Sequence, residues 1–265
     1  MFRIRSIVVF ILCALLLLPL RGSATNAPKR PMPILMYHNI VPDGEAAEGM
    51  SVTAAGFRAD MQWLRDHGYS FVLPRELAAG NIPDKPVLVT FDDGYASNYT
   101  LLFPILRELD VKVAIALVVS MPEERESARF LSWDMCREMS DSGLVEFGSH
   151  TYDLHNFDGR GGMFTKGRPN GIQRLKGESR AGYEARVWAD LQKSIDAIQT
   201  QLGTPVGYLA YPYGRMDPWA EDFVRDHFYL TVSTHPAVAD LDGGLYGMDR
   251  LTISPDQPVA SYLKD

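Results

Sequence analysis

Short apolar runs alternate along this chain with longer segments in which apolar residues recur at helical spacing. The segment 54–67 is an example, because Phe57, Met61 and Leu64 share one helical face. Apolar runs predict strands at 34–37, 87–91, 113–119, 145–149, 208–211 and 230–233. Helical periodicity predicts helices at 54–67, 99–109, 132–142, 183–202 and 218–227.

The predicted strands are apolar without alternation, which is typical of strands buried on both faces of a parallel sheet. Six or seven β-α units in ~240 residues favour a (β/α) barrel or an open doubly wound sheet. One compositional break lies at 156–182, where glycines and basic residues predict a loop. This loop either is simply solvated or steers an anionic polymer or a partner.

The composition narrows the class of protein. Hydrophobic residues make up 46% of the 265 residues and charged residues 22%, which indicates a globular protein with a sizeable core. These values exclude disordered, collagen-like and coiled-coil chains. The formal net charge of -7 argues against a nucleic-acid partner, which requires a basic surface.

The N-terminus has the pattern of a secretory signal peptide. Two arginines precede an unbroken apolar run at 7–18, and a proline and small residues follow it. A helix of this length spans about 18 Å, too little for a ~30 Å hydrocarbon core, although an uncleaved anchor is the alternative. We predict a signal peptide at 1–24, cleavage after Ala24 or Ala27, and an exported chain, periplasmic or extracellular, with no stable membrane span. Cys136 is then the single cysteine, which excludes an internal disulfide.

Two consecutive carboxylates, Asp92 and Asp93, follow the predicted strand at 87–91 and precede Gly94. In a continuing strand they would point to opposite faces, but a glycine lets the chain turn, so that both address one cleft. Adjacent carboxylates repel each other, and a cation between them keeps both ionised. The motif alone is consistent with a metal site or with a solvated turn.

Two histidines, His150 and His155, follow the predicted strand at 145–149. Imidazole is a common ligand for zinc-like ions, but this spacing converges only in an irregular loop. Two unrelated histidines are the alternative. The coincidence with the paired aspartates favours the metal site, because active sites of parallel α/β folds gather at the carboxyl ends of strands.

These residues resemble the motifs of a known family. Residues 90–95 resemble the first motif of the polysaccharide deacetylases (NodB-homology, carbohydrate esterase family 4), and 150–155 resemble the second. The histidine spacing and the segments 34–38 and 210–214 resemble the branch that deacetylates poly-β-1,6-N-acetylglucosamine. The similarity spans about 33–253.

The resemblance implies a distorted (β/α)7-type barrel and a catalytic domain at 25–265. It implies a divalent metal, most commonly zinc with cobalt, nickel or iron as alternatives, held by Asp93, His150 and His155. Asp92 is the implied general base, and the backbone N–H of Tyr213 is the implied oxyanion donor.

Further side chains are candidates for contact with the sugar. His38 ends the first predicted strand, and the tyrosines offer faces on which sugar rings stack. These candidates are His38, Tyr95, Tyr211 and Arg250.

The sequence also departs from the family pattern. The family carries an arginine that orients the base where this chain has Ala210, and it carries a late histidine as general acid where this chain has none after His235. Arg250 or His235 are the candidates for these roles, and the general acid stays open.

The leading hypothesis is a metal-dependent N-deacetylase of an extracytoplasmic N-acetylglucosamine polysaccharide, first of all poly-β-1,6-N-acetylglucosamine. The alternatives are a peptidoglycan or chitooligosaccharide deacetylase and a non-catalytic polysaccharide-binding relative. Nothing in the sequence identifies a protein partner.

Overall fold

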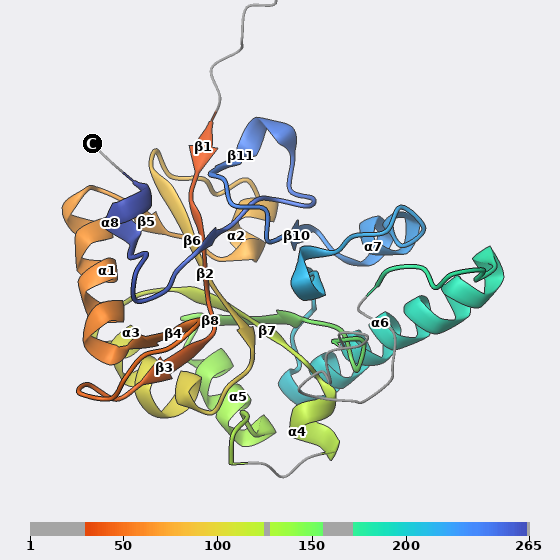
Figure 1. Cartoon of the computed structure of the whole chain (residues 1–265), viewed down its shortest axis with the longest axis horizontal. Coiled ribbons are helices and arrows are strands. Elements are labelled where there is room, and N and C mark those ends of the chain that lie inside the picture. Colours follow the sequence, from red (N-terminus) through yellow and green to blue (C-terminus); the bar gives the residue numbers. More distant parts are fainter. Residues whose placement is uncertain (1–29, 125–127, 156–171, 264–265) are drawn as a thin grey trace, which may run out of the picture.

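A curled, parallel sheet forms the centre of the molecule in the computed structural model, which describes residues 30–124, 128–155 and 172–263 (Figure 1). Its neighbouring strands run in the order β10-β9-β8-β7-β6-β2-β12, and β5 pairs with the start of β6. The strands are β2 (Ile34–Tyr37), β5 (Ser70–Phe71), β6 (Pro86–Asp93), β7 (Val113–Leu117), β8 (Val145–Ser149), β9 (Tyr208–Ala210), β10 (Leu230–Val232) and β12 (Leu251–Thr252). Every pairing among them is parallel.

The segment before β12 connects the two edges of this sheet. The amide of Met248 donates to the carbonyl of Thr231 at 2.9 Å, and the amide of Ser233 donates to the carbonyl of Met248 at 2.8 Å. The chain then enters β12, which pairs with β2 at the other edge. The sheet therefore curls into a distorted (β/α) barrel, as predicted.

Helices surround the sheet: in Figure 1, α1 and α3 lie to its left, α5 below it, and α6 and α7 to its right. They are α1 (Ala54–Asp66), α2 (Pro74–Ala78), α3 (Phe103–Leu109), α4 (Ser120–Glu124), α5 (Trp133–Asp141), α6 (Arg180–Leu202), α7 (Glu221–His227) and α8 (Val259–Tyr262). The side chain of Thr53 caps α1, and Phe57, Met61 and Leu64 are buried as predicted. Cys136 is buried in α5.

Short elements complete the fold. They are β1 (Pro31–Met32), β3 (Asn39–Val41), β4 (Ser51–Thr53), β11 (Ala239–Asp240), the π-helix Asn98–Leu102 and the 3-10 helices Pro212–Gly214 and Leu241–Gly243. The sequence predicted none of the four strands, because runs of two or three residues carry no periodicity.

Three predicted α-helices begin at least three residues from the expected position. The predicted helix 99–109 is a π-helix at Asn98–Leu102 that continues as α3 from Phe103. The predicted helix 218–227 begins at Glu221, because Asp217 accepts from the amides of Trp219 and Ala220 and so holds these residues in a turn. The helix predicted from 183 already begins at Arg180, where the side chain of Ser179 caps it.

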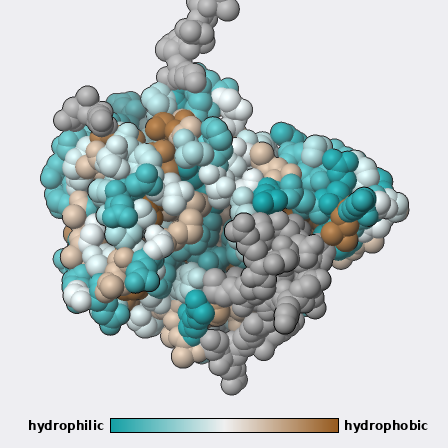
Figure 2. All heavy atoms as spheres, viewed as in Figure 1, coloured by the Kyte–Doolittle hydropathy of each residue, from teal (hydrophilic) through white to brown (hydrophobic). Residues whose placement is uncertain are grey.

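The predicted basic loop 156–182 is described only from Ile172 onwards; residues 156–171 and the predicted signal peptide 1–24 lie outside the described residues. In the described part, Arg174 pairs with Asp217, and Ile172 is fully buried. This part packs against the fold. Figure 2 shows mostly hydrophilic residues over the lobe that carries α7 and the start of α6.

Among the described residues, no helix combines the length and the apolar character needed to cross a lipid bilayer.

Candidate metal centre

The paired carboxylates lie at the carboxyl end of β6, which continues through Asp93. Asp93 has a φ of 75° and Gly94 a φ of 79°, so the chain leaves the extended conformation at Asp93 itself. This break removes the alternation that would separate the two side chains. Asp92 and Asp93 both line a cavity of about 360 Å³, as the sequence predicted for one cleft.

The two histidines reach the same cavity from the loop after β8. Thr151 has a φ of 71°, which is rare for a β-branched residue and reverses the chain between the histidines. His150 Nδ1 lies 2.7 Å from the carbonyl of Ala210. Because a carbonyl only accepts, Nδ1 carries the proton and the lone pair of Nε2 faces the cavity.

The ligand atoms of Asp93, His150 and His155 all lie within 4.8 Å of one another. Oδ1 of Asp93 is 3.7 Å from Nε2 of His150 and 3.3 Å from Nε2 of His155. That oxygen is buried and accepts no hydrogen bond from the described residues. A carboxylate oxygen buried without a donor is costly unless a cation satisfies it.

The electrostatics of this cluster suit a metal ion. Burial, together with His150, lowers the pKa of His155 to about 4, so its imidazole is neutral near pH 7, the form that binds metals. One carboxylate and two imidazoles are a ligand set for zinc, and they leave positions for water and substrate. The residues therefore fit a divalent metal.

Asp92 lies beside the cluster but is held by a different partner. Arg250 donates to its two carboxylate oxygens at 2.8 and 2.7 Å, and further to Thr90 Oγ1 and to the carbonyl of Ser233. Burial alone would raise the pKa of Asp92, but the charge of Arg250, then His150, and the bonds from Arg250 lower it. Asp92 is therefore ionised.

This geometry corrects the expectation that Arg250 contacts substrate. Its side chain is fully buried and does not line the cavity. Arg250 instead orients the carboxylate of Asp92. The family pattern gives this role to an arginine at the position where this chain has Ala210. His235 is largely exposed and pairs with Asp249, so it takes no part in the cluster.

The remaining predicted residues differ in their access to the cavity. His38, Tyr95 and Tyr213 line it. Tyr211 does not, because its side chain is fully buried and its hydroxyl donates to Glu221 at 3.1 Å. The sequence placed Tyr211 at the end of a strand, but its side chain packs on the core side.

No motif in the sequence marks the rest of the cavity wall. The cavity is also lined by Met36, Asn39, Met50, Ser51 and Thr234. Three of them come from the segment around β3 and β4, which pair in parallel as a separate small sheet. Ser97 donates to the Asn39 side chain, which in turn donates to Ser51, so this wall is tied to the end of β6.

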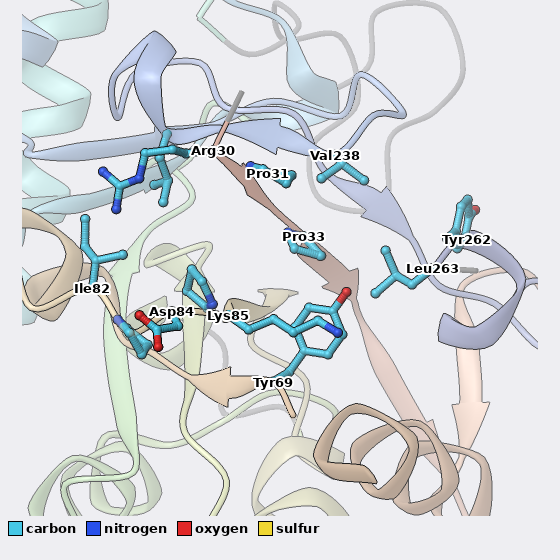
Figure 3. Close-up of a pocket in the computed structure, with 13 residues that line it drawn as sticks. Arg30, Pro31, Pro33, Tyr69, Ile82, Asp84, Lys85, Val238, Tyr262 and Leu263 are labelled. Atoms are coloured by element: carbon cyan, nitrogen blue, oxygen red, sulfur yellow. The ribbon is translucent and has the colours of Figure 1, made fainter. Parts of the chain in front are cut away.

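A second cavity, of about 510 Å³, lies at the opposite end of the barrel (Figure 3). Pro33 and Pro86 in its wall stand at the amino ends of β2 and β6. Tyr69, Lys85 and Tyr262 complete its more polar side. It shares no residue with the metal cluster.

The sequence profile of the polysaccharide deacetylases matches residues 79–231, more than half of the chain and both motif loops. The chain belongs to the polysaccharide deacetylase family. The poly-β-1,6-N-acetyl-D-glucosamine N-deacetylase of Escherichia coli strain K12 is 29% identical over 249 residues, or 86% of this chain and 36% of that protein. The present chain thus covers little more than a third of the length of that relative.

Solved structures of deacetylases share the fold. IcaB from Ammonifex degensii has a TM-score of 0.72 and 28% identity over 85% of this chain and 93% of that one. The Streptococcus pyogenes deacetylase PplD, determined with acetate, has a TM-score of 0.69 and 25% identity over 88% of this chain and 97% of that one. The distorted barrel is thus the fold of this family.

Proposed function

We propose that this chain is a metal-dependent N-deacetylase of an N-acetylglucosamine polysaccharide, with poly-β-1,6-N-acetylglucosamine as its substrate and zinc as its metal. One observation carries the proposal: a buried carboxylate and two imidazoles converge beside a second carboxylate in one cavity. The name of the similar Escherichia coli protein supports the choice of polymer.

An amide carbonyl is a weak electrophile, so its hydrolysis needs help for both the water and the carbonyl. A metal held by Asp93, His150 and His155 would lower the pKa of bound water and polarise the acetyl oxygen. Asp92 belongs to no ligand cluster among the residues that the structure describes, and it takes the proton from the attacking water. Arg250 keeps that carboxylate ionised and fixes its direction through two hydrogen bonds.

Two further roles follow from the lining of the cavity. Tyr213 has a φ of 55° and stands at the rim beside His155, where its backbone N–H is assigned to the developing oxyanion. His38 is the third histidine of the cavity and is not one of the ligands. Its buried Nδ1 has no hydrogen-bond partner among the described residues, and burial lowers the pKa of its imidazole, so we assign the neutral ring to a hydrogen bond with the sugar. The proton that Asp92 takes from the water is then the one available to the leaving amine.

Tyr95 and the β3–β4 wall supply the surface for the sugar. The ring of Tyr95 stacks on Phe130 with centroids 5.4 Å apart, which fixes its orientation at the cavity. Met50 also lines the cavity and is 41% exposed. An aromatic ring and an apolar side chain facing a polar cluster suit a pyranose, whose faces are apolar and whose edges are polar.

The test is acetate release from poly-β-1,6-N-acetylglucosamine oligomers, with chitooligosaccharides and peptidoglycan fragments in parallel. We expect release that a chelator abolishes and added zinc restores, and no release by His155→Ala. Asp92→Asn should lower the rate about 10²–10⁴-fold while the protein still binds metal, because this residue moves a proton but holds no ion.

Acetate release from chitooligosaccharides or peptidoglycan alone would mean that one of these polymers, and not poly-β-1,6-N-acetylglucosamine, is the substrate. Binding of oligomers without release under any metal would identify the chain as a non-catalytic relative. An unchanged rate in Asp92→Asn would refute its assignment as the base.

We also propose that residues 1–24 are a signal peptide, that residues 25–265 form the catalytic domain, and that the mature chain acts outside the cytoplasm. The charged and apolar pattern of the N-terminus supports this proposal. N-terminal sequencing of the mature protein tests it, with a first residue of 25 or 28 expected.

A further inference from the structure

The loop that carries both histidine ligands is fastened by a carboxylate from a distant helix. Asp190, on α6, accepts from the amide of Tyr152 at 2.8 Å through Oδ1 and from the amide of Asp153 at 3.0 Å through Oδ2. Both amides lie between His150 and His155. A half-buried carboxylate that accepts two backbone N–H groups forms strong, charge-assisted bonds.

A second contact from the same helix face fixes the start of the loop. Ser194 follows Asp190 by one helical turn, and its hydroxyl lies 2.7 Å from that of Ser149. Ser149 in turn accepts from the amide of Thr151 at 3.0 Å. The helix therefore holds the loop at the residue before His150 and again in its middle.

This loop needs such fastening because its conformation is not one the chain prefers. Thr151 has a φ of 71°, and a β-branched residue in that region is strained unless its surroundings impose it. The bonds to Asp190 satisfy the two amides that directly follow Thr151. Without them, the turn that carries the two imidazoles to Asp93 loses two of its side-chain hydrogen bonds.

We propose that Asp190 is a positioning residue of the metal centre: its carboxylate holds the loop so that His150 and His155 both face Asp93. It belongs to no ligand cluster of the described residues, so it acts through the loop and not by touching the ion. Lys193 and Asp153 are the charged groups beside it; the ammonium of Lys193 lies 3.5 Å from the ring centroid of Tyr152. The inference rests on the metal site of the proposed function.

The test measures metal affinity without substrate. Cobalt and zinc are titrated against a chromophoric chelator with the wild-type protein, Asp190→Asn and Asp190→Ala. An asparagine oxygen accepts from one amide only, and alanine accepts from neither. We expect the dissociation constant of the metal to rise about 10–100-fold, the range for partners that orient ligands.

The matched control is Asp196→Asn, which removes a carboxylate from an exposed position of the same helix, where Gln192 is its hydrogen-bond donor. We expect its metal affinity to stay within twofold of wild type. We also expect that raising the metal concentration restores acetate release by Asp190→Asn. Thermal melting of the metal-free variants measures folding separately from metal binding. If Asp190→Asn does not fold, Asp190→Ala serves as the test, because alanine is the better helix former.

A lower melting temperature with unchanged metal affinity would overturn the proposal, because Asp190 would then only stabilise the fold. Failure of the wild-type protein to release acetate, with metal binding intact and weakened by Asp190→Asn, would refute the deacetylase function and leave this inference standing. A wild-type protein that binds neither metal would overturn both.

Discussion

Arg250 holds the proposed general base, although it lies 158 residues further along the chain. Both residues are almost completely buried, so each charge depends on the other to offset its lost hydration. Replacing the arginine by an apolar residue leaves a buried carboxylate without its cation. This is among the most costly kinds of single substitution.

We expect Arg250→Met to lower the free energy of unfolding at pH 7 by about 3–5 kcal/mol, measured by urea denaturation. Because the pKa of Asp92 is lowered below its ordinary 3.8, the pair's contribution is complete above about pH 4 and is lost as the pH falls through the lowered pKa. The deficit of the variant should therefore shrink in acid.

Arg58→Met is the control, since it breaks an exposed, solvent-screened pair with Glu108 and should lower the free energy of unfolding far less. Equal losses of unfolding free energy in the two variants would show that the buried pair stabilises the fold no more than the exposed pair does.

At the scale of the elements, the strands of the barrel could be predicted because buried parallel strands are continuous apolar runs. The segment 34–37 is predicted with the bounds that the structure shows, and so is 145–149. The paired aspartates could be found because they stand at the end of such a strand, and the two histidines because they share the loop after another. The pairing of Arg250 with Asp92 could not be predicted, because it depends on how the barrel closes. The strand that follows Arg250, β12, has only two residues and so gives no pattern in the sequence.

The junction of β6 with its following loop depends on Gly94. Its φ of 79° strains any other residue, and an added Cβ would lie 2.6 Å from Cδ2 of Leu117 on the neighbouring strand β7. We expect Gly94→Ala to destabilise the fold by more than the ~1–2 kcal/mol of backbone strain and to weaken metal binding, because Asp93 precedes it.

Gly143→Ala separates these effects. Gly143 has a similar φ of 74°, but nothing lies within 4 Å of an added Cβ. Thermal melting and cobalt titration of the two variants should show strain in both and weakened metal binding in Gly94→Ala alone. Equal metal affinities would mean that the turn at Gly94 does not set the position of Asp93.

At the scale of the whole molecule, the proposed metal joins two parts of the barrel that β7 separates. Asp93 comes from β6, and the two histidines come from the loop after β8. A ligand that binds the folded state alone stabilises it by mass action, by about 4 kcal/mol at a thousand times its dissociation constant. For a chain of this size, that corresponds to a rise in melting temperature of roughly 8–16 °C.

We therefore expect zinc to raise the melting temperature of the metal-free protein by this amount, and a chelator to reverse the rise. His155→Ala should lose most of the rise, because two ligands remain. His235→Ala should keep it, since that side chain is largely exposed and pairs with Asp249 outside the cluster. A rise that persists in His155→Ala would place the bound metal elsewhere on the molecule, and the three side chains would then need another explanation for their convergence.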